Sequence, residues 1–117
     1  MHELSILMEV VRVVEEEAKK NNIDSVKCIV LQVGELSTVV PLFMEEYFSN
    51  VVDGNPMFSD ATLQIETLPG IAKCRKCETQ FNVVENKGWC PNCGSYDKDL
   101  VCGEEFFIKE ILVPDIT

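Results

Sequence analysis

Four cysteines arranged as two C-x2-C pairs are the residues of this sequence best suited to chemistry. Cys74 and Cys77 form the first pair, Cys90 and Cys93 form the second, and twelve residues separate the two pairs. Two such pairs across a short loop can bring four thiolates onto one tetrahedral metal ion. The second pair continues into Gly94, and glycine allows the tight backbone turn that a metal-bound sulfur needs. The spacing therefore predicts a metal site made of four sulfurs.

The identity of the ion depends on further features of the chain. Four thiolates leave no open coordination position, which is typical of structural zinc and not of catalytic zinc. The same arrangement can hold iron, as in a rubredoxin-like electron carrier, and a pair of disulfides is a third alternative. Zinc is favoured because nothing else in the chain indicates redox partners. The start of the chain does not resemble a secretory signal, so we expect a cytoplasmic location, where thiols stay reduced.

The first three residues form a second candidate metal site of a different kind. His2, the only histidine in the chain, stands next to Met1. The Met1 amine, the His2 backbone nitrogen and the His2 Nδ1 can form two fused chelate rings. The Glu3 backbone nitrogen or carboxylate can supply a fourth donor. Nitrogen donors in a plane suit Ni(II) or Cu(II), although a histidine at position 2 is by itself a weak signal.

Length and charge limit the remaining possibilities. The 117 residues, 46% of them apolar, can form one core with a small satellite, and no apolar run is long enough to span a membrane. The net charge of −10 lies almost entirely outside residues 71–102, which carry five basic and four acidic residues against five and sixteen elsewhere. Four thiolates on Zn²⁺ would add two negative charges, which disfavours a zinc ribbon that binds nucleic acid. A zinc-ribbon module for protein interaction or nucleic-acid binding, with an inert N-terminus, stays open as the alternative function.

The N-terminal third of the chain predicts a helix followed by a buried strand. Residues 3–20 carry apolar side chains at helical spacing, and Glu15-Glu16-Glu17 is expected to be a solvated face. Residues 25–36 are mostly apolar and β-branched, as in a strand buried along most of its length. Cys28 lies within this strand and is expected to pack as a small apolar residue. The helical stripe comprises Leu4, Leu7, Val11, Val14 and Ala18, widened by Met8, Val10 and Val13.

A second helix and two further strands follow. Pro41 suits the first turn of a helix whose inward side chains are expected to be Phe43, Tyr47 and Val51. Residues 61–67 alternate between apolar and polar side chains, which predicts a strand with one wet face. A last strand follows Gly103, with Phe106 and Ile108 on one face and Phe107 on the other.

These elements predict an α+β fold. It is a small mixed α/β domain of two helices on a three-stranded sheet, with an inserted four-cysteine zinc ribbon. Residues 1–70 and 103–117 are expected to form the discontinuous α/β domain, and residues 71–102 the zinc-binding domain. Pro69-Gly70 and Cys102-Gly103 are the expected hinges between them. The insertion would also permit exchange of segments between two copies, so a monomer and a segment-swapped dimer both stay open.

Four motifs taken together resemble those of the HypA/HybF family of hydrogenase maturation proteins. They are Met1-His2-Glu3 at the start of a helix, Val33-Gly34-Glu35-Leu36-Ser37 after the first strand, the four cysteines, and Gly103-Glu104-Glu105 before the last strand. The resemblance covers essentially the whole chain. It implies a nickel-binding α/β domain with Ni(II) held at Met1, His2 and Glu3. It also implies a zinc domain with structural zinc on Cys74, Cys77, Cys90 and Cys93.

The resemblance implies a metallochaperone rather than an enzyme. Its cargo would be Ni(II), delivered to the large subunit of a nickel–iron hydrogenase in cooperation with the GTPase HypB, and in some organisms also used for urease maturation. The chain has no phosphate-binding glycine loop, so nucleotide hydrolysis would come from the partner. Two features depart from a plain version of the family. Cys28 and Cys102 are extra thiols, expected to be packed or in a loop, although Cys102, nine residues after Cys93, could compete as a ligand. No glycine follows Cys77.

Overall fold

The computed structural model describes residues 2–37, 39 and 41–114, and of His2 only the backbone. Helices and strands follow one another in the predicted order, and the α+β prediction is confirmed. The elements are α1 (His2–Lys20), β1 (Cys28–Gly34), α2 (Pro41–Val51), the 3-10 helix η1 (Pro56–Phe58), β2 (Thr62–Leu68), β3 (Ile71–Cys74), β4 (Gln80–Asn82), β5 (Lys98–Cys102) and β6 (Phe106–Leu112).

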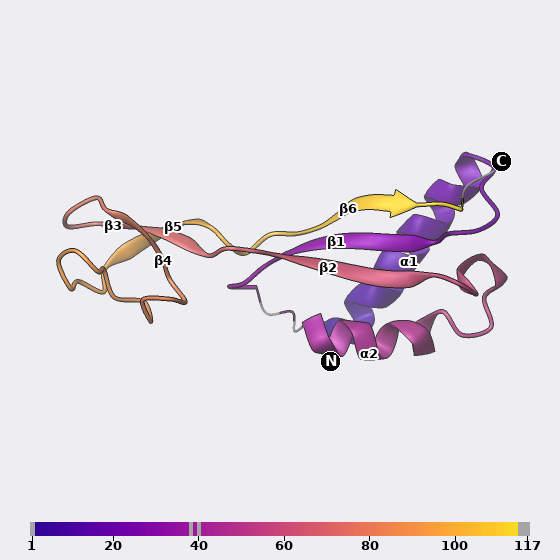
Figure 1. Cartoon of the computed structure of the whole chain (residues 1–117), viewed down its shortest axis with the longest axis horizontal. Coiled ribbons are helices and arrows are strands. Elements are labelled where there is room, and N and C mark those ends of the chain that lie inside the picture. Colours follow the sequence, from indigo (N-terminus) through magenta and orange to yellow (C-terminus); the bar gives the residue numbers. More distant parts are fainter. Residues whose placement is uncertain (1, 38, 40, 115–117) are drawn as a thin grey trace. The chain divides into compact units, whose positions relative to one another are not determined.

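The first sheet has β1 at its centre, between β2 and β6 (Figure 1). Hydrogen bonds from Thr62 N to Lys27 O and from Glu35 N to Leu68 O join β1 and β2 in parallel. Bonds from Lys27 N to Leu112 O and from Gly34 N to Glu105 O join β1 and β6 antiparallel. Because parallel neighbours need a crossover connection, α2 lies between β1 and β2 in the chain. The central strand is accordingly the most buried, as its apolar sequence predicts.

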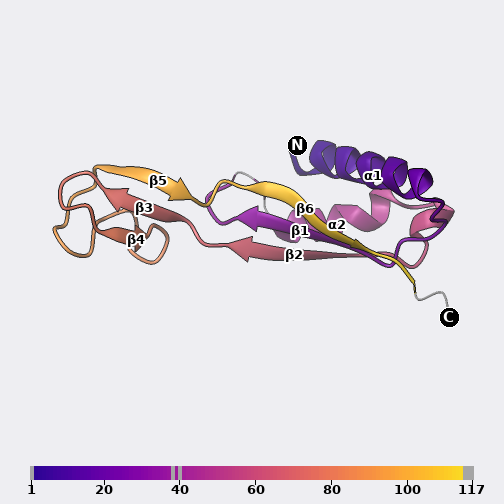
Figure 2. The same ribbon diagram turned by 90° about the horizontal axis from the view of Figure 1, so that it is seen from above.

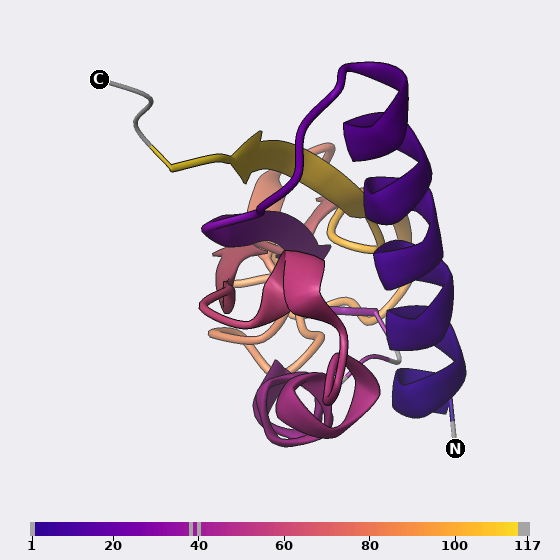
Figure 3. The same cartoon turned by 90° about the vertical axis from the view of Figure 1, so that its right-hand side faces the viewer.

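Both helices pack on one side of this sheet (Figures 2 and 3). The buried face of α1 is the predicted stripe, apart from Leu4, which is half-buried. Val10 widens this face as expected, but Met8 and Val13 do not, because they are 58% and 39% exposed. The stripe is therefore narrower than the sequence suggests. Its buried members are Leu7, Val10, Val11, Val14 and Ala18.

The prediction for the buried face of α2 was wrong by one residue. Met44 and Phe48 are the buried side chains of α2. Phe43 is 42% exposed, and its ring lies 6.4 Å from that of the half-buried Tyr47. Apolar residues occur at a spacing of four in both registers, so periodicity alone could not decide between them. Contact with the sheet and α1 selects the stripe that contains Met44.

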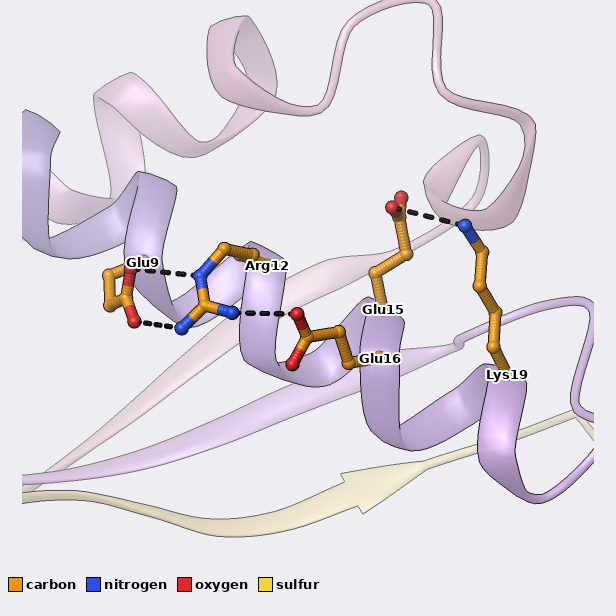
Figure 4. Close-up of polar contacts among 5 residues, drawn as sticks. All are labelled: Glu9, Arg12, Glu15, Glu16 and Lys19. Atoms are coloured by element: carbon orange, nitrogen blue, oxygen red, sulfur yellow. Dashed lines mark hydrogen bonds and ion pairs between the residues drawn. The ribbon is translucent and has the colours of Figure 1, made fainter.

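The outer face of α1 is covered by ion pairs one turn apart (Figure 4). The Arg12 guanidinium contacts Glu9 and lies 2.7 Å from Glu16 Oε1, and these contacts raise the pKa of Arg12 and lower that of Glu9. Glu15 differs from the solvated face predicted for it, because its carboxylate accepts a 2.7 Å hydrogen bond from Asn55 Nδ2. This bond lowers the pKa of Glu15 and joins α1 to the loop before η1.

The chain separates into two compact units. The helical unit comprises Met1–Leu31, Val39–Glu66 and Phe107–Thr117. The ribbon unit comprises Gln32–Thr38 and Thr67–Phe106, and contains a second sheet with strand order β4-β3-β5. Neither helix of the described residues combines the length and the apolar content that a membrane crossing requires.

Close backbone packing marks the base of the ribbon unit. A Cβ atom on Gly34 would lie 2.0 Å from Gly103 O, and one on Gly103 would lie 2.5 Å from the Cα of Gly70. Gly103 also has a φ of 125°, which side chains rarely allow. Gly70 and Gly103, which belong to the expected hinge segments, therefore lie in close backbone contact within the ribbon unit.

Candidate metal centre

The four predicted cysteines come together at the end of the ribbon unit. The sulfurs of Cys74, Cys77, Cys90 and Cys93 all lie within 4.8 Å of one another. Two of the separations, Cys74 to Cys93 and Cys77 to Cys90, are 3.5 Å. Sulfurs about 2.3 Å from one zinc ion would be roughly 3.8 Å apart in a tetrahedron. The site therefore fits one tetrahedral ion, and 3.5 Å is too long for a disulfide.

Both cysteine pairs form the same hydrogen-bonded turn. In each turn, the carbonyl oxygen of the first cysteine accepts a hydrogen bond from the backbone N–H four residues later. The N–H of the same cysteine donates to the carbonyl oxygen five residues later. Such turns aim both sulfurs of a pair toward one point, which explains the C-x2-C spacing. The bonds are Glu78 N to Cys74 O (2.9 Å), Cys74 N to Thr79 O (2.9 Å), Gly94 N to Cys90 O (2.8 Å) and Cys90 N to Ser95 O (2.9 Å).

The two turns differ at the position that needs a left-handed backbone. Gly94 occupies it in the second turn with a φ of 77°, whereas Glu78 occupies it in the first with a φ of 63°. The absent glycine noted in the sequence is thus replaced by a glutamate that takes the conformation at some energetic cost. The 3.7 Å contact between Glu78 and Lys73 is exposed and offsets little of that cost.

We therefore expect Glu78→Gly to stabilise the metal-loaded protein by about 0.5–1 kcal/mol, since strain is relieved and part of the gain is lost to unfolded-state entropy. Gly94→Ala should destabilise it by about 1 kcal/mol through backbone strain alone, because no atom lies within 4 Å of the added Cβ. Urea unfolding followed by Trp89 fluorescence measures both. A lower midpoint for Glu78→Gly would contradict this explanation.

The surroundings of the thiols shift their pKa values in opposite directions. Bonds from Asn92 and Thr79 lower the pKa of Cys77 to about 5, and a backbone bond from Cys77 lowers that of Cys74. At Cys93 a bond from the Ser95 backbone favours the thiolate, but the neighbouring thiols and burial outweigh it and raise the pKa to about 12. The four thiols therefore hold protons between them in the absence of metal, and metal binding should release protons.

An arginine ties the first turn to the strand that follows the second. Arg75 Nη2 lies 2.6 Å and its Nε 2.9 Å from Asp99 Oδ1, and its Nη1 lies 3.0 Å from Asp97 Oδ1. The backbone N–H of Arg75 also donates to Asp97 O. The guanidinium lowers the pKa of Asp99. This guanidinium therefore pairs with two carboxylates from the segment at the start of β5.

The other two cysteines lie outside the metal cluster. Cys28 is 7% exposed and packs in the core of the helical unit, as expected for a small apolar side chain. Cys102 is half-buried, and its sulfur lies 3.6 Å from Pro69 O. Both were predicted to be packed or loop thiols. Cys28 is packed, and Cys102 is the last residue of β5 and lies outside the group of four sulfurs. The sequence did not identify Thr79, Asn92 or Arg75, whose roles depend on turns that no short motif encodes.

The structure describes the N-terminal candidate site only in part. Met1 and the His2 side chain lie outside the described residues. The backbone of His2 begins α1, and Glu3 lies in its first turn with a half-buried side chain. The geometry of Met1, His2 and Glu3 as metal ligands therefore stays a prediction.

Comparison with known proteins agrees with this architecture. Residues 1–113 match the family model of HypA, described as a hydrogenase/urease nickel incorporation metallochaperone. The hydrogenase maturation factor HypA of Geobacter sulfurreducens is 40% identical over 113 residues, which cover 97% of this chain and 99% of that protein. HypA of Trichodesmium erythraeum is 36% identical over 117 residues, which cover 100% of this chain and 99% of that protein.

Two solved structures share the fold. The solution structure of the Ni metallochaperone HypA from Helicobacter pylori has a TM-score of 0.64 at 23% identity. The match covers 95% of this chain and 96% of the Helicobacter pylori chain. A second solution structure of a HypA protein has a TM-score of 0.69 at 24% identity and covers 97% of each chain. Sequence matches over nearly its full length, together with the four-cysteine site, show that this chain belongs to the HypA family of nickel-incorporation metallochaperones.

Proposed function

We propose that this chain binds Ni(II) at Met1, His2 and Glu3 and delivers it to the large subunit of a nickel–iron hydrogenase. Membership of a nickel-incorporation family across residues 1–113 is the observation that carries the proposal. Nickel is a cargo here, and the chain itself is not an enzyme. A site of few ligands at the chain end suits a cargo, because it can give the metal up to a client.

The start of α1 is physically suited to this role. The first N–H groups of a helix have no intrahelical partner, so losing a proton from one of them to bind metal breaks no helical hydrogen bond. The helix dipole opposes a cation at this end, but a deprotonated amide and the nearby Glu3 carboxylate offset it. An α-amine has a pKa of about 7.7–8.0 and must lose its proton to bind. Nickel affinity should therefore fall as the pH falls below neutral.

We propose zinc as the resident ion of Cys74, Cys77, Cys90 and Cys93. A closed set of four thiolates fits a structural ion and offers no open position for chemistry. Iron would use the same ligands, so metal analysis of untagged protein decides between them. Zinc predicts a colourless protein with one equivalent of zinc, whereas a rubredoxin-like iron site would colour it red.

The proposed partners follow from this role. They are a HypB-type GTPase, which would supply nucleotide hydrolysis, the hydrogenase large subunit as client, and urease maturation proteins in an organism that makes urease. Neither nucleic acid nor membrane is a proposed partner, and the proposed location is the cytoplasm. A monomer and a segment-swapped dimer are distinguished by light scattering of the purified protein.

Removing the imidazole tests the nickel site. We expect His2→Ala to weaken Ni(II) binding on the order of 100-fold, or about 2.7 kcal/mol, with zinc content and circular dichroism unchanged. Isothermal titration of untagged protein measures it, because an N-terminal tag would remove the proposed amine ligand. Glu17→Ala, an exposed change on the same helix, is the matched control. One-to-one nickel binding of unchanged affinity in His2→Ala would reject the proposal.

A further inference from the structure

The side chain of Glu35 is held between two parts of the ribbon unit. Its Oε1 accepts a 2.7 Å hydrogen bond from Gly70 N and a 3.0 Å bond from Asn82 Nδ2. Gly70 immediately precedes β3, and Asn82 is the last residue of β4. Glu35 itself lies in the turn after β1, far from both in sequence. One carboxylate oxygen therefore joins the turn after β1 to the residue before β3 and to the last residue of β4.

The backbone around Glu35 is also fixed. Glu35 N donates to Leu68 O, and Leu36 N donates to Gly103 O, both at 2.8 Å. Leu36 fills the space next to Gly70, where an added Cβ would lie 2.4 Å from its Cγ. The turn therefore contacts Leu68 and Gly70, which precede β3, and Gly103, which follows β5. Glu35 is consequently a fixed point from which a hydrogen bond can position Asn82.

Asn82 in turn forms hydrogen bonds with the segment that leads to the second cysteine pair. Its Oδ1 accepts a 2.9 Å bond from Glu85 N, and its carbonyl accepts bonds from the backbone and side chain of Asn86. Asn86 O in turn accepts a 2.9 Å bond from Trp89 N, immediately before Cys90. A short series of hydrogen bonds thus runs from Glu35 through the 82–89 turn to Trp89, the chain neighbour of Cys90.

We propose that the Glu35–Asn82 hydrogen bond is a positioning contact that holds the second cysteine pair in its metal-binding geometry and slows loss of the resident ion. Partners beyond the ligands commonly change metal affinity by about 10–100-fold. The bond has a charged acceptor, which makes it stronger than a neutral pair. The inference relies on the proposed zinc occupancy, and it assigns to two non-ligand residues a role in retaining the metal.

Reversing the polarity of the bond provides a sharp test. In Asn82→Asp the side chain keeps the acceptor for Glu85 N but places a second carboxylate against Glu35, so the bond is lost. In Glu35→Gln the amide oxygen can still accept from both Gly70 N and Asn82. In the double variant the Gln amide N–H₂ can donate to the new Asp, which restores the bond in the opposite direction and keeps the net charge of the wild type.

The readout is the rate at which zinc passes from the full-length protein to an excess of a chromogenic chelator at pH 8. We expect Asn82→Asp to release zinc about 10-fold faster than wild type, and Glu35→Gln and the double variant to stay within about threefold. Glu85→Ala, which removes an exposed ribbon carboxylate but keeps the backbone donor, is the control and should match wild type.

The outcomes separate this inference from the zinc assignment. A zinc-loaded protein in which Asn82→Asp releases metal at the wild-type rate would overturn the positioning role alone. So would a fast Asn82→Asp variant that Glu35→Gln fails to rescue, because the loss would then not depend on the bond. Wild-type protein purified with no zinc would overturn both the zinc assignment and the positioning role. Circular dichroism of each variant before chelation shows whether the helical unit is folded.

Discussion

Replacing Cys74 and Cys90 together with serine is expected to abolish zinc binding and to unfold the ribbon unit while α1 and α2 stay folded. The reason lies in the composition of the ribbon core. Its buried cluster consists of Ala72, Cys74, Phe81 and Cys90, with Cys77 and Val83 packed against it. Two of the four buried residues are proposed metal ligands, and Phe81 is the only large apolar side chain among them.

So small an apolar core cannot offset the loss of chain entropy on its own. Units of this size usually depend on metal ions, disulfides or a partner for stability. Structural zinc typically contributes about 10–16 kcal/mol of binding free energy coupled to folding. The helical unit has a separate core that contains no proposed zinc ligand, including Leu7, Ile29, Leu31 and Met44. We therefore expect the loss of structure to be confined largely to the ribbon.

Two spectroscopic signals separate the units. Trp89 is the only tryptophan of the chain, lies in the ribbon, and has its ring 4.8 Å from that of Tyr96. The near-ultraviolet circular dichroism of this ring pair should be lost in the double variant, whereas the far-ultraviolet signal of the helices should persist. Cys102→Ser is the control, because Cys102 lies outside the cluster. A native-like near-ultraviolet signal in a zinc-free double variant would disprove the dependence on metal.

The metal site could be predicted from sequence because its information is local. Each cysteine pair lies within one turn, and the C-x2-C spacing by itself encodes two sulfurs aimed at one point. The buried face of α1 and the burial of β1 could be predicted for the same reason, since their patterns repeat over a single element. The first sheet then follows from the order of helices and strands, with the ribbon inserted before β6.

What could not be predicted depends on contacts between distant segments. The register of α2 depends on whether Met44 or Phe43 faces the sheet, and both registers satisfy the helical period. The hydrogen bond of Glu15 with Asn55 spans 40 positions, so a run of three glutamates gives no sign of it. Likewise Glu35 stands out in sequence only as part of a family motif. Its bond to Asn82, 47 positions away, appears only when the turn after β1 lies beside the end of β4.

The strongest single-residue effect is expected at Gly34, where a methyl group has no space. In Gly34→Ala the new Cβ would lie 2.0 Å from Gly103 O, 2.2 Å from Gly103 C and 2.7 Å from Glu104 N. All three are backbone atoms, so no side-chain rotation relieves the overlap. The segments must move apart by more than 1 Å to reach ordinary contact, at roughly 3.4 Å or more.

Such a movement would break the hydrogen bonds from Gly34 N to Glu105 O and from Leu36 N to Gly103 O. Overpacking alone typically costs about 1–3 kcal/mol, and each lost backbone bond adds about 1 kcal/mol. We therefore expect a loss of about 3–5 kcal/mol, a size that indicates a specific structural cause. The urea midpoint of the zinc-loaded protein, followed by circular dichroism and Trp89 emission, measures it.

Gly54→Ala is the matched control, because Gly54 has a φ of 77° but no atom within 4 Å of an added Cβ. It should lose only about 1 kcal/mol, from backbone strain alone. If Gly34→Ala lost no more stability than Gly54→Ala, the close packing of Gly34 against Gly103 would not be rigid.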